Sequence, residues 1–294
     1  MNRFSVLVRF EIRKILSQKK AILFLLALNV IPILASFIAL LIFIKFKGLG
    51  FGNIEFSVLL QLVRGLFTGH MKFFLFIAPF FLALVVGDSF SGESGRGYLK
   101  TLLLTPVARW QIVCAKAISI LLFLLLAVAL GGFFLQLNLW VARAITDSPT
   151  LVMDIGEKDV STSLVEFGTG MRLLFLSFVT NLTLVGFFIL FSLFFDSAII
   201  MTFVSLIVLM GIQTFTMMAP YLDKLDDRYG KIAEWLFTKP LSQLSDLNII
   251  TGLLEKKYDL GTQVVMEPLA SSLAWAIFFF LLSFLVFERR QILN

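Results

Sequence analysis

The residues best able to do chemistry gather between positions 88 and 116 of this 294-residue chain. Residues 92–95 read Gly-Glu-Ser-Gly, the G-x-S-G spacing found around some serine nucleophiles. A serine nucleophile needs a base within hydrogen-bond reach, and the only histidine is His70. The sequence contains no H-E-x-x-H zinc motif and no G-x-x-x-x-G-K-[ST] phosphate loop, and its single Cys114 cannot form an internal disulfide. We therefore expect no catalytic, metal or cofactor site on this chain.

The elements that position these residues follow from an unusually apolar composition. Hydrophobic residues make up 59% of the chain and charged residues 15%, whereas a soluble domain is about half apolar and a quarter charged. Lipid must therefore solvate much of the surface. The net charge of +6 is carried at the ends of apolar runs, which is typical of membrane topology and argues against a nucleic-acid partner.

Six apolar runs without Asp, Glu, Lys or Arg predict an all-α membrane protein with six transmembrane helices. Only Asp196 separates the fourth run from the fifth, so we expect a tight helical hairpin there. The first run has 24 uncharged residues, which is too long for the apolar core of a signal peptide. The six runs are 21–44, 73–87, 117–142, 173–195, 197–219 and 268–287.

The basic residues orient these six spans. Six Lys and Arg residues lie within positions 1–20, four more lie between spans two and three, and Arg289 and Arg290 follow the last span. Lys and Arg near span ends mark the cytoplasmic side. We therefore expect both termini in the cytoplasm of a bacterial cell, the protein in its inner membrane, and segments 144–170 and 220–267 outside.

Residues 1–20 have the pattern of an amphipathic helix lying in the membrane interface. Its basic residues, including Arg9 and Arg13, occupy one side, as in helices that lie at the headgroup level. A plain cytoplasmic extension of the first span is the alternative. The apolar side comprises Phe4, Val8, Ile12, Ile15 and Leu16.

Segment 88–112 predicts a glycine-rich turn followed by a short amphipathic helix on the cytoplasmic face. Leu99 and residues 102–104 supply the apolar side of that helix, and Pro106 ends it because the residue before a proline avoids the α conformation. The third span then begins near Arg109. The residues alone leave two functions open, docking onto another protein or simply connecting two spans.

The same stretch resembles the cytoplasmic loop of the permease subunits of type-2 ABC exporters, whose pattern reads roughly G-E-R-E-S-G-T-L-E-x-L-L-x-T-P-V-S-R-W-x-I-x-x-G-K. The residues that depart from that pattern are Gly95, Arg96, Tyr98 and Ala115. The residues that match it are Gly92, Glu93, Gly97, Leu99, Thr105, Pro106, Val107, Arg109, Trp110 and Lys116.

The resemblance implies a single permease domain over residues 1–294, with a coupling helix between spans two and three. That helix would sit in a cleft of a separate ATPase subunit, which binds ATP and Mg, and two permeases with two ATPase subunits would form an exporter. The apolar, charge-free spans suit a hydrophobic or amphiphilic substrate. This chain would then be no enzyme. The residues implied to couple to the ATPase are Glu93, Arg96, Gly97, Lys100, Leu102, Leu103, Pro106, Arg109 and Lys116.

Three alternatives stay open at this stage. Some relatives of such permeases transmit force to a periplasmic partner and move no solute, and segments 144–170 and 220–267 could hold such a partner. A secondary transporter is a second alternative, although carriers usually place ionisable residues within their spans. The third is a protease similar to the rhomboids, but His70 is expected on the opposite membrane face from Ser94.

Overall fold

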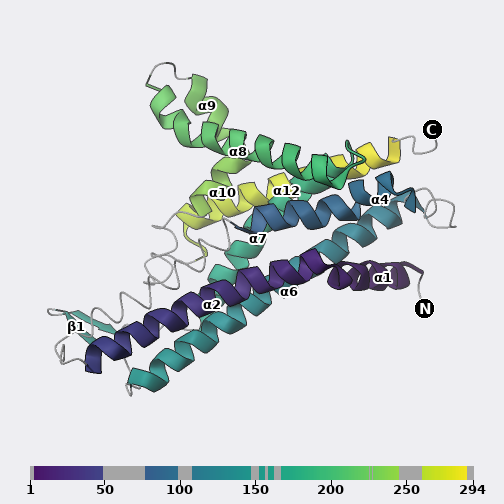
Figure 1. Ribbon diagram of the computed structural model, residues 1–294. Coiled ribbons are helices and arrows are strands. Elements are labelled where there is room, and N and C mark those ends of the chain that lie inside the picture. Colours follow the sequence, from purple (N-terminus) through teal and green to yellow (C-terminus); the bar gives the residue numbers. More distant parts are fainter. Residues whose placement is uncertain are drawn as a thin grey trace.

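The computed structural model is an elongated, predominantly helical bundle (Figure 1). Its helical character confirms the main expectation of the sequence. One departure is a short antiparallel ladder of β1 (Val152–Ile155) and β2 (Lys158–Ser161), in which Val152 pairs with Ser161. The structure describes residues 3–48, 77–98, 108–146, 152–155, 158–161, 167–224, 226, 228–244 and 260–289.

Two long helices and a shorter helical segment form one side of the bundle. Helix α2 (Lys19–Gly48) packs along α6 (Arg109–Thr146), and the helical segment 77–89 lies against both. Buried Phe24 of α2 joins all three, because its ring centroid lies 5.2 Å from that of Phe81 and 5.6 Å from that of Phe123. The third predicted span begins near Arg109 as expected and belongs to a longer helix.

Helices α7 (Phe167–Ser192), α8 (Ala198–Leu222) and α12 (Gln263–Arg289) form the other side. The predicted hairpin about Asp196 is confirmed, since only residues 193–197 separate α7 from α8. Helix α8 runs on through Pro220, which the sequence placed at the start of a polar segment. Because proline has no N–H, it leaves the carbonyl oxygen of Thr216 without its helical donor, and the helix ends two residues later at Leu222.

The segment between α8 and α12 folds back onto the bundle through α9 (Arg228–Glu234) and α10 (Thr238–Leu244). Phe237 lies buried with its ring centroid 5.0 Å from that of Phe187 on α7 and 5.1 Å from that of Phe279 on α12. The neighbouring Trp235 is 79% exposed. Phe237 therefore packs inside the bundle, whereas Trp235 lies at its surface.

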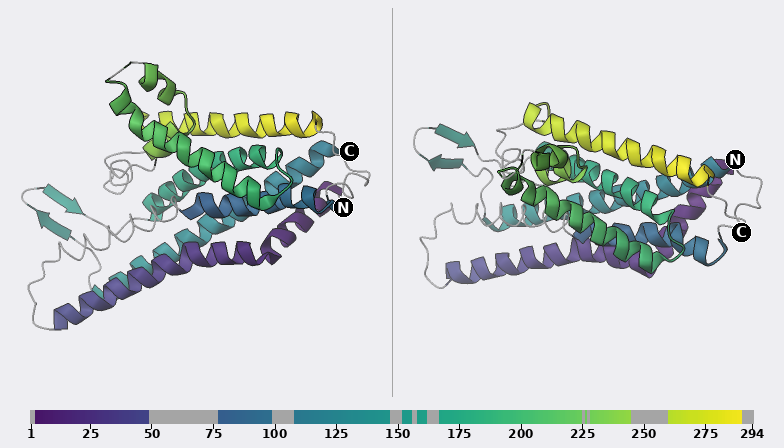
Figure 2. Two further views of the ribbon diagram at one scale, coloured as in Figure 1. Left: turned by 45° about the horizontal axis from the view of Figure 1, so that its top comes forward. Right: turned by 90° about the horizontal axis from the view of Figure 1, so that it is seen from above.

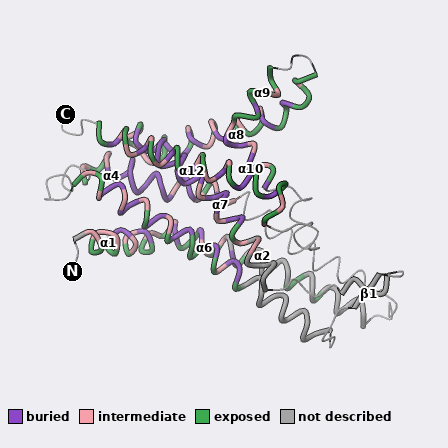
Figure 3. The backbone as a smooth tube through the Cα atoms, turned by 180° about the vertical axis from the view of Figure 1, so that it is seen from behind, coloured by how far each residue is buried: buried purple, intermediate pink, exposed green. Residues whose placement is uncertain are grey.

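Burial differs sharply between the long helices (Figure 3). Four helical stretches in the described residues are long and apolar enough to cross a membrane: Arg109–Phe133, Leu174–Ser192, Ala198–Leu222 and Gln263–Arg289. The span of α7 is 72% buried and lies at the centre, whereas that of α8 is 28% buried and exposes large apolar side chains such as Phe203 and Ile207. Apolar side chains facing outward along a long helix indicate contact with lipid or with another membrane helix.

Several elements that are distant in sequence gather at one end of the bundle (Figure 1, Figure 2). They are α1 (Arg3–Ser17), α4 (Ser91–Gly95), the start of α6, the α7–α8 turn and the end of α12. Arg109 at the start of α6 donates from Nη1 to the carbonyl oxygen of Glu288 near the end of α12, at 3.3 Å. The segments that the sequence assigns to one membrane side thus lie at one end of the molecule.

Candidate functional site: a buried ionic cluster

The segment that resembles the coupling loop begins where the helix 77–89 ends. The sequence predicted a glycine-rich turn here, but residues 91–95 form the short helix α4, because the amide of Ser94 bonds to the carbonyl of Phe90 and that of Arg96 to Gly92. Gly97 ends it with a φ of 76°, a conformation that glycine adopts without a steric penalty.

Helix α4 is held against the turn between α7 and α8. Ser91 donates a hydrogen bond from Oγ to the carbonyl oxygen of Ser192 at 2.8 Å, and Ser94 donates to Oδ1 of Asp196 at 2.7 Å. A Cβ atom at Gly95 would collide with the carbonyl oxygen of Asp196. Only glycine allows this close approach, so the position of α4 is fixed by backbone contact as well as by hydrogen bonds.

Behind α4, three charged residues from three different elements meet in the interior. Lys116 of α6 places Nζ 2.7 Å from Oε2 of Glu93 on α4 and 3.1 Å from Oε1 of Glu11 on α1. The side chain of Lys116 is 0% exposed, and those of Glu11 and Glu93 are 3% and 4% exposed. The ammonium also lies 5.6 Å from the centroid of the Phe90 ring, within the range of a cation–π contact.

Lys14 completes this ionic cluster, which comprises Glu11, Lys14, Glu93 and Lys116. It forms ion pairs with Glu93 and, at 3.7 Å, with Glu11, so the cluster holds two carboxylates and two ammonium groups. Burial, reinforced by the positive charge of Lys116, lowers the pKa of Lys14 to about 8, against the opposing effect of Glu11. The cluster therefore holds as many carboxylates as amino groups, and burial makes the Lys14 ammonium release its proton more readily than an exposed lysine does.

A second charged contact lies beside the cluster and joins the start of α2 to the end of the segment 77–89. Lys20 donates from Nζ to Oδ2 of Asp88 at 2.8 Å, and Nη2 of Arg96 lies 3.8 Å from Oδ1 of the same carboxylate. Lys20 and Arg96 are 44% and 63% exposed, more than any member of the cluster, so this contact is weaker per pair than the buried one.

Helix α1 is held to α6 by further contacts along its length. Ser119 donates from Oγ to the carbonyl oxygen of Val8 at 3.2 Å, and the ring of Phe4 stacks on that of Trp110 with centroids 6.4 Å apart. Helix α1 lies across the ends of the long helices rather than along them (Figure 2). An amphipathic helix in this orientation matches the geometry expected of one lying in a membrane interface.

The energetics of buried ion pairs indicate what such a cluster does. Removing one partner of a buried pair costs about 3–5 kcal/mol, whereas replacing the whole group by apolar residues is often neutral. Each member of the cluster is therefore costly to remove alone, because its partners would be left as unmatched buried charges. The cluster joins α1, α4 and α6 through these ion pairs.

The nine residues implied by the resemblance fall into three groups. Glu93 and Lys116 lie together in the buried cluster, so their side chains contact this chain. Arg96 and Gly97 lie at the surface end of α4, and Arg109 contacts α12. Lys100, Leu102, Leu103 and Pro106 lie outside the described residues, as does the predicted amphipathic helix that contains them. The prediction that these nine residues couple to an ATPase subunit stays a prediction.

Sequence reasoning missed Glu11 and Lys14. A signal was present, because Glu11 is the only acidic residue among positions 1–20 and lies between Val8 and Ile15 on the side of α1 that packs against α6. An acid on the packed side of a helix requires a buried partner. In the part of the chain that the structure describes, no group of three or more His, Cys, Asp or Glu side chains is placed to hold a metal ion.

The long apolar helices and the charged cluster at one end define the class of this chain, a multi-pass helical membrane protein. Residues 33–293 match a family model described as a protein of unknown function, DUF2705. Because the match covers most of the chain, the protein belongs to this family. No curated protein matches the chain. The matched residues include Glu93 and Lys116 but not Glu11 or Lys14.

Proposed function

We propose that this protein is the membrane-spanning subunit of an ATP-driven ABC exporter, with the segment after α4 as its contact to a separate ATPase subunit. The observation that carries the proposal is the attachment of α4 to α1 and α6 by the buried ionic cluster. Helix α4 and the segment that follows it carry residues that resemble the coupling loop of type-2 exporter permeases. A docked loop can move membrane helices only if it is rigidly attached to them, and the cluster provides that attachment.

The proposed topology has six spans. Four are the apolar stretches of α6, α7, α8 and α12, and two more are α2 and the helix that includes residues 77–89. In this proposal the end of the bundle that holds α1, α4 and the end of α12 faces the cytoplasm of the bacterial inner membrane. Two copies would pair, and the ATPase subunits would bind ATP and Mg.

The cluster changes the roles proposed for two residues. Glu93 and Lys116 are buried, so we assign them to transmitting movement within this chain, and we assign partner contact to Arg96, Gly97 and the loop that follows. When two ATPase subunits close on ATP, a loop docked on each would be displaced. Helix α4 would then shift α1 and α6 as one body, as in rocking models of alternating access.

A crosslinking experiment tests the partner contact. A photoreactive amino acid replaces Tyr98, which is 63% exposed just after α4, and in a matched control replaces Tyr221, which is 72% exposed near the far end of α8. Illumination of cells should join the Tyr98 variant, but not the Tyr221 variant, to an ATP-binding protein identified by mass spectrometry. A Tyr98 adduct that contains no ATP-binding protein would overturn the proposal.

A labelling experiment tests the orientation. In a Cys114→Ser background, single cysteines at Arg96 and Asp226 probe the two ends of the bundle, since both positions are exposed. A membrane-impermeant maleimide should label the Asp226→Cys variant in intact cells and the Arg96→Cys variant only after lysis. The reverse pattern would place α4 outside the cell, where no ATPase could reach it.

A transport assay in sealed vesicles that contain this protein and the crosslinked ATP-binding protein distinguishes export from force transmission. Export of an amphiphilic solute that depends on ATP would support the exporter. A Tyr98 adduct without any solute movement would keep the ATPase contact and shift the function to pulling on an external partner through segments 144–170 and 220–267.

A further inference from the structure

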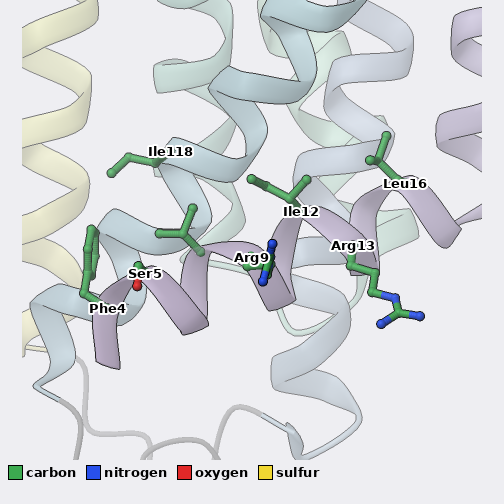
Figure 4. Close-up of a pocket in the computed structure, with 8 residues that line it drawn as sticks. Phe4, Ser5, Arg9, Ile12, Arg13, Leu16 and Ile118 are labelled. Carbon is green, nitrogen blue, oxygen red and sulfur yellow. The ribbon is translucent and has the colours of Figure 1, made fainter. Parts of the chain in front are cut away.

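The side of α1 that faces away from the ionic cluster forms a groove with α6. The groove has a volume of about 650 Å³. Its walls are apolar side chains from α1 together with Ile118 of α6, and Arg9 and Arg13 lie at its edge (Figure 4). The apolar side chains of Phe4, Ile12 and Leu16 rise toward the long helices, whereas Arg13 points away from them (Figure 4).

The two arginines differ from the lysines on the same helix. Arg9 and Arg13 are both exposed and lie one helical turn apart, so their guanidinium groups can reach one anion together. Among the residues that the structure describes, neither has an acidic partner, while Lys14 and Lys20 are both paired with carboxylates. The positive charge at the groove is therefore available for an external anion.

The apolar side of the groove continues along α6. Ile118, Leu122 and Leu125 follow one another at helical spacing and are 37%, 43% and 50% exposed. Residues at this spacing share one face of a helix, so they extend the groove as an apolar track along a stretch of α6 that is long and apolar enough to cross a membrane. The site thus combines cations at the end of the bundle with an apolar path leading along it.

We propose that this groove binds one anionic phospholipid, with its phosphate between Arg9 and Arg13 and one acyl chain along Ile118, Leu122 and Leu125. A phospholipid has both parts in the required order, a charged headgroup at the level of an interfacial helix and a chain running into the membrane. A soluble phosphate compound would leave the apolar track empty, and an apolar peptide would leave the arginines without an anion. The inference rests on α1 lying at the membrane interface, and it is independent of the proposed exporter function.

Native mass spectrometry of the purified protein in detergent tests the site with two lipids of identical chains, dioleoyl phosphatidylglycerol and dioleoyl phosphatidylcholine. The double variant Arg9→Gln/Arg13→Gln removes the phosphate contact, and the variant Lys19→Gln/Lys224→Gln removes two exposed charges elsewhere as a matched control. A basic residue near an anionic surface raises affinity roughly fivefold. The Arg9→Gln/Arg13→Gln variant should therefore bind phosphatidylglycerol about 25-fold more weakly, and the control variant should bind it as the native protein does.

A third variant probes the apolar track without changing charge. Ile118→Trp fills the groove at an exposed position that tolerates bulk and should weaken the binding of both lipids. Equal loss of phosphatidylglycerol in the control pair, or equal binding of both lipids to the native protein, would overturn the proposal. A dimer that is lost in Ile118→Trp would show that a second copy occupies the groove, which also overturns it. None of these results bears on the Tyr98 crosslink, which tests the exporter proposal separately.

Discussion

Two helix contacts in this protein are made in opposite ways. Helices α7 and α12 meet through small and aromatic residues: a Cβ atom at Gly186 would lie 3.0 Å from Cβ of Phe279, and the hydroxyls of Thr183 and Ser272 lie 2.7 Å apart. Helices α1, α4 and α6 meet through the buried charges of the ionic cluster, with Lys116 at its centre. The first contact is close packing, and the second is a small set of directional bonds.

The difference matters for movement. Close packing between apolar helices changes only if many side chains rearrange together. An ionic contact depends on a few atoms, so it can hold one arrangement firmly and lose it abruptly when a partner charge shifts. The α7–α12 pair is suited to be the fixed part of the bundle, and the cluster to be the connection through which, in the proposed function, α1, α4 and α6 move together.

The largest effect should come from removing the cation at the centre of the cluster. Lys116→Met leaves Glu11 and Glu93 with only the half-buried Lys14, and it should lower the free energy of unfolding in detergent by about 3–5 kcal/mol. Lys19→Met, at an exposed lysine, is the matched control and should change it little. Equal stability of the two variants would mean that the buried ion pairs of Lys116 do not hold the three helices together.

Removing one charge of each sign sharpens this comparison. Glu93→Gln/Lys116→Met leaves the pair between Glu11 and Lys14 within α1, so most of the lost stability should return, because no buried charge is then unmatched. If the cluster transmits movement, the double variant should still crosslink to the ATPase from position 98 but lose transport. Full transport by this stable variant would reduce the cluster to a stabilising contact.

The pKa of Lys14 gives the cluster a pH dependence that the α7–α12 contact lacks. With a pKa of about 8 instead of 10.5, folded Lys14 has lost a proton that the unfolded chain retains between these two pH values. Stability therefore rises with pH across that window. The neutral amine also reacts with acylating reagents, so labelling of Lys14 followed by mass spectrometry should rise with a midpoint near pH 8.

Lys14 is 32% exposed, which allows a small reagent to reach it. The labelling of exposed Lys19 in the same digest corrects for changes in the reactivity of the reagent with pH. The Lys14→Gln variant identifies the labelled peptide. Labelling of Lys14 that begins only above about pH 10, where an unperturbed lysine titrates, would contradict the description of the cluster as buried.

A smaller effect should follow from widening the close-packed contact. Gly186→Ala brings a methyl group to Phe279 and to the carbonyl of Ala276, 3.3 Å away, and should destabilise the protein by about 1–3 kcal/mol. Gly211→Ala on α8 is the matched control, since no atom lies within 4 Å of its added Cβ. It should be neutral or stabilising by up to about 1 kcal/mol. If both variants are less stable, the loss comes from replacing a helical glycine by alanine and not from the contact between α7 and α12.

The smallest effect concerns the contact between α4 and the α7–α8 turn. Ser94→Ala removes one exposed hydrogen bond to Asp196 and should cost about 1 kcal/mol or less. Ser17→Ala, which removes a bond within one helix end, is the control for losing a serine hydroxyl. A larger loss in Ser94→Ala than in Gly186→Ala would contradict the expected ranking of these two contacts.

The sequence by itself determined the long helices, because an apolar run in lipid must satisfy its backbone internally. It placed the hairpin at Asp196, the start of α6 near Arg109 and the amphipathic character of α1, all of which depend on neighbours in the chain. The resemblance to the exporter loop also drew attention to Glu93 and Lys116.

Only the tertiary structure decided what those two residues contact. Glu11 is 105 residues from Lys116 in the sequence, and Phe237 is separated from its partners Phe187 and Phe279 by whole helices. A helical pattern specifies which side of each helix is apolar, but not which other helix covers it. A buried charge needs an opposite charge nearby to offset its desolvation. Which opposite charge is near depends on how the helices pack.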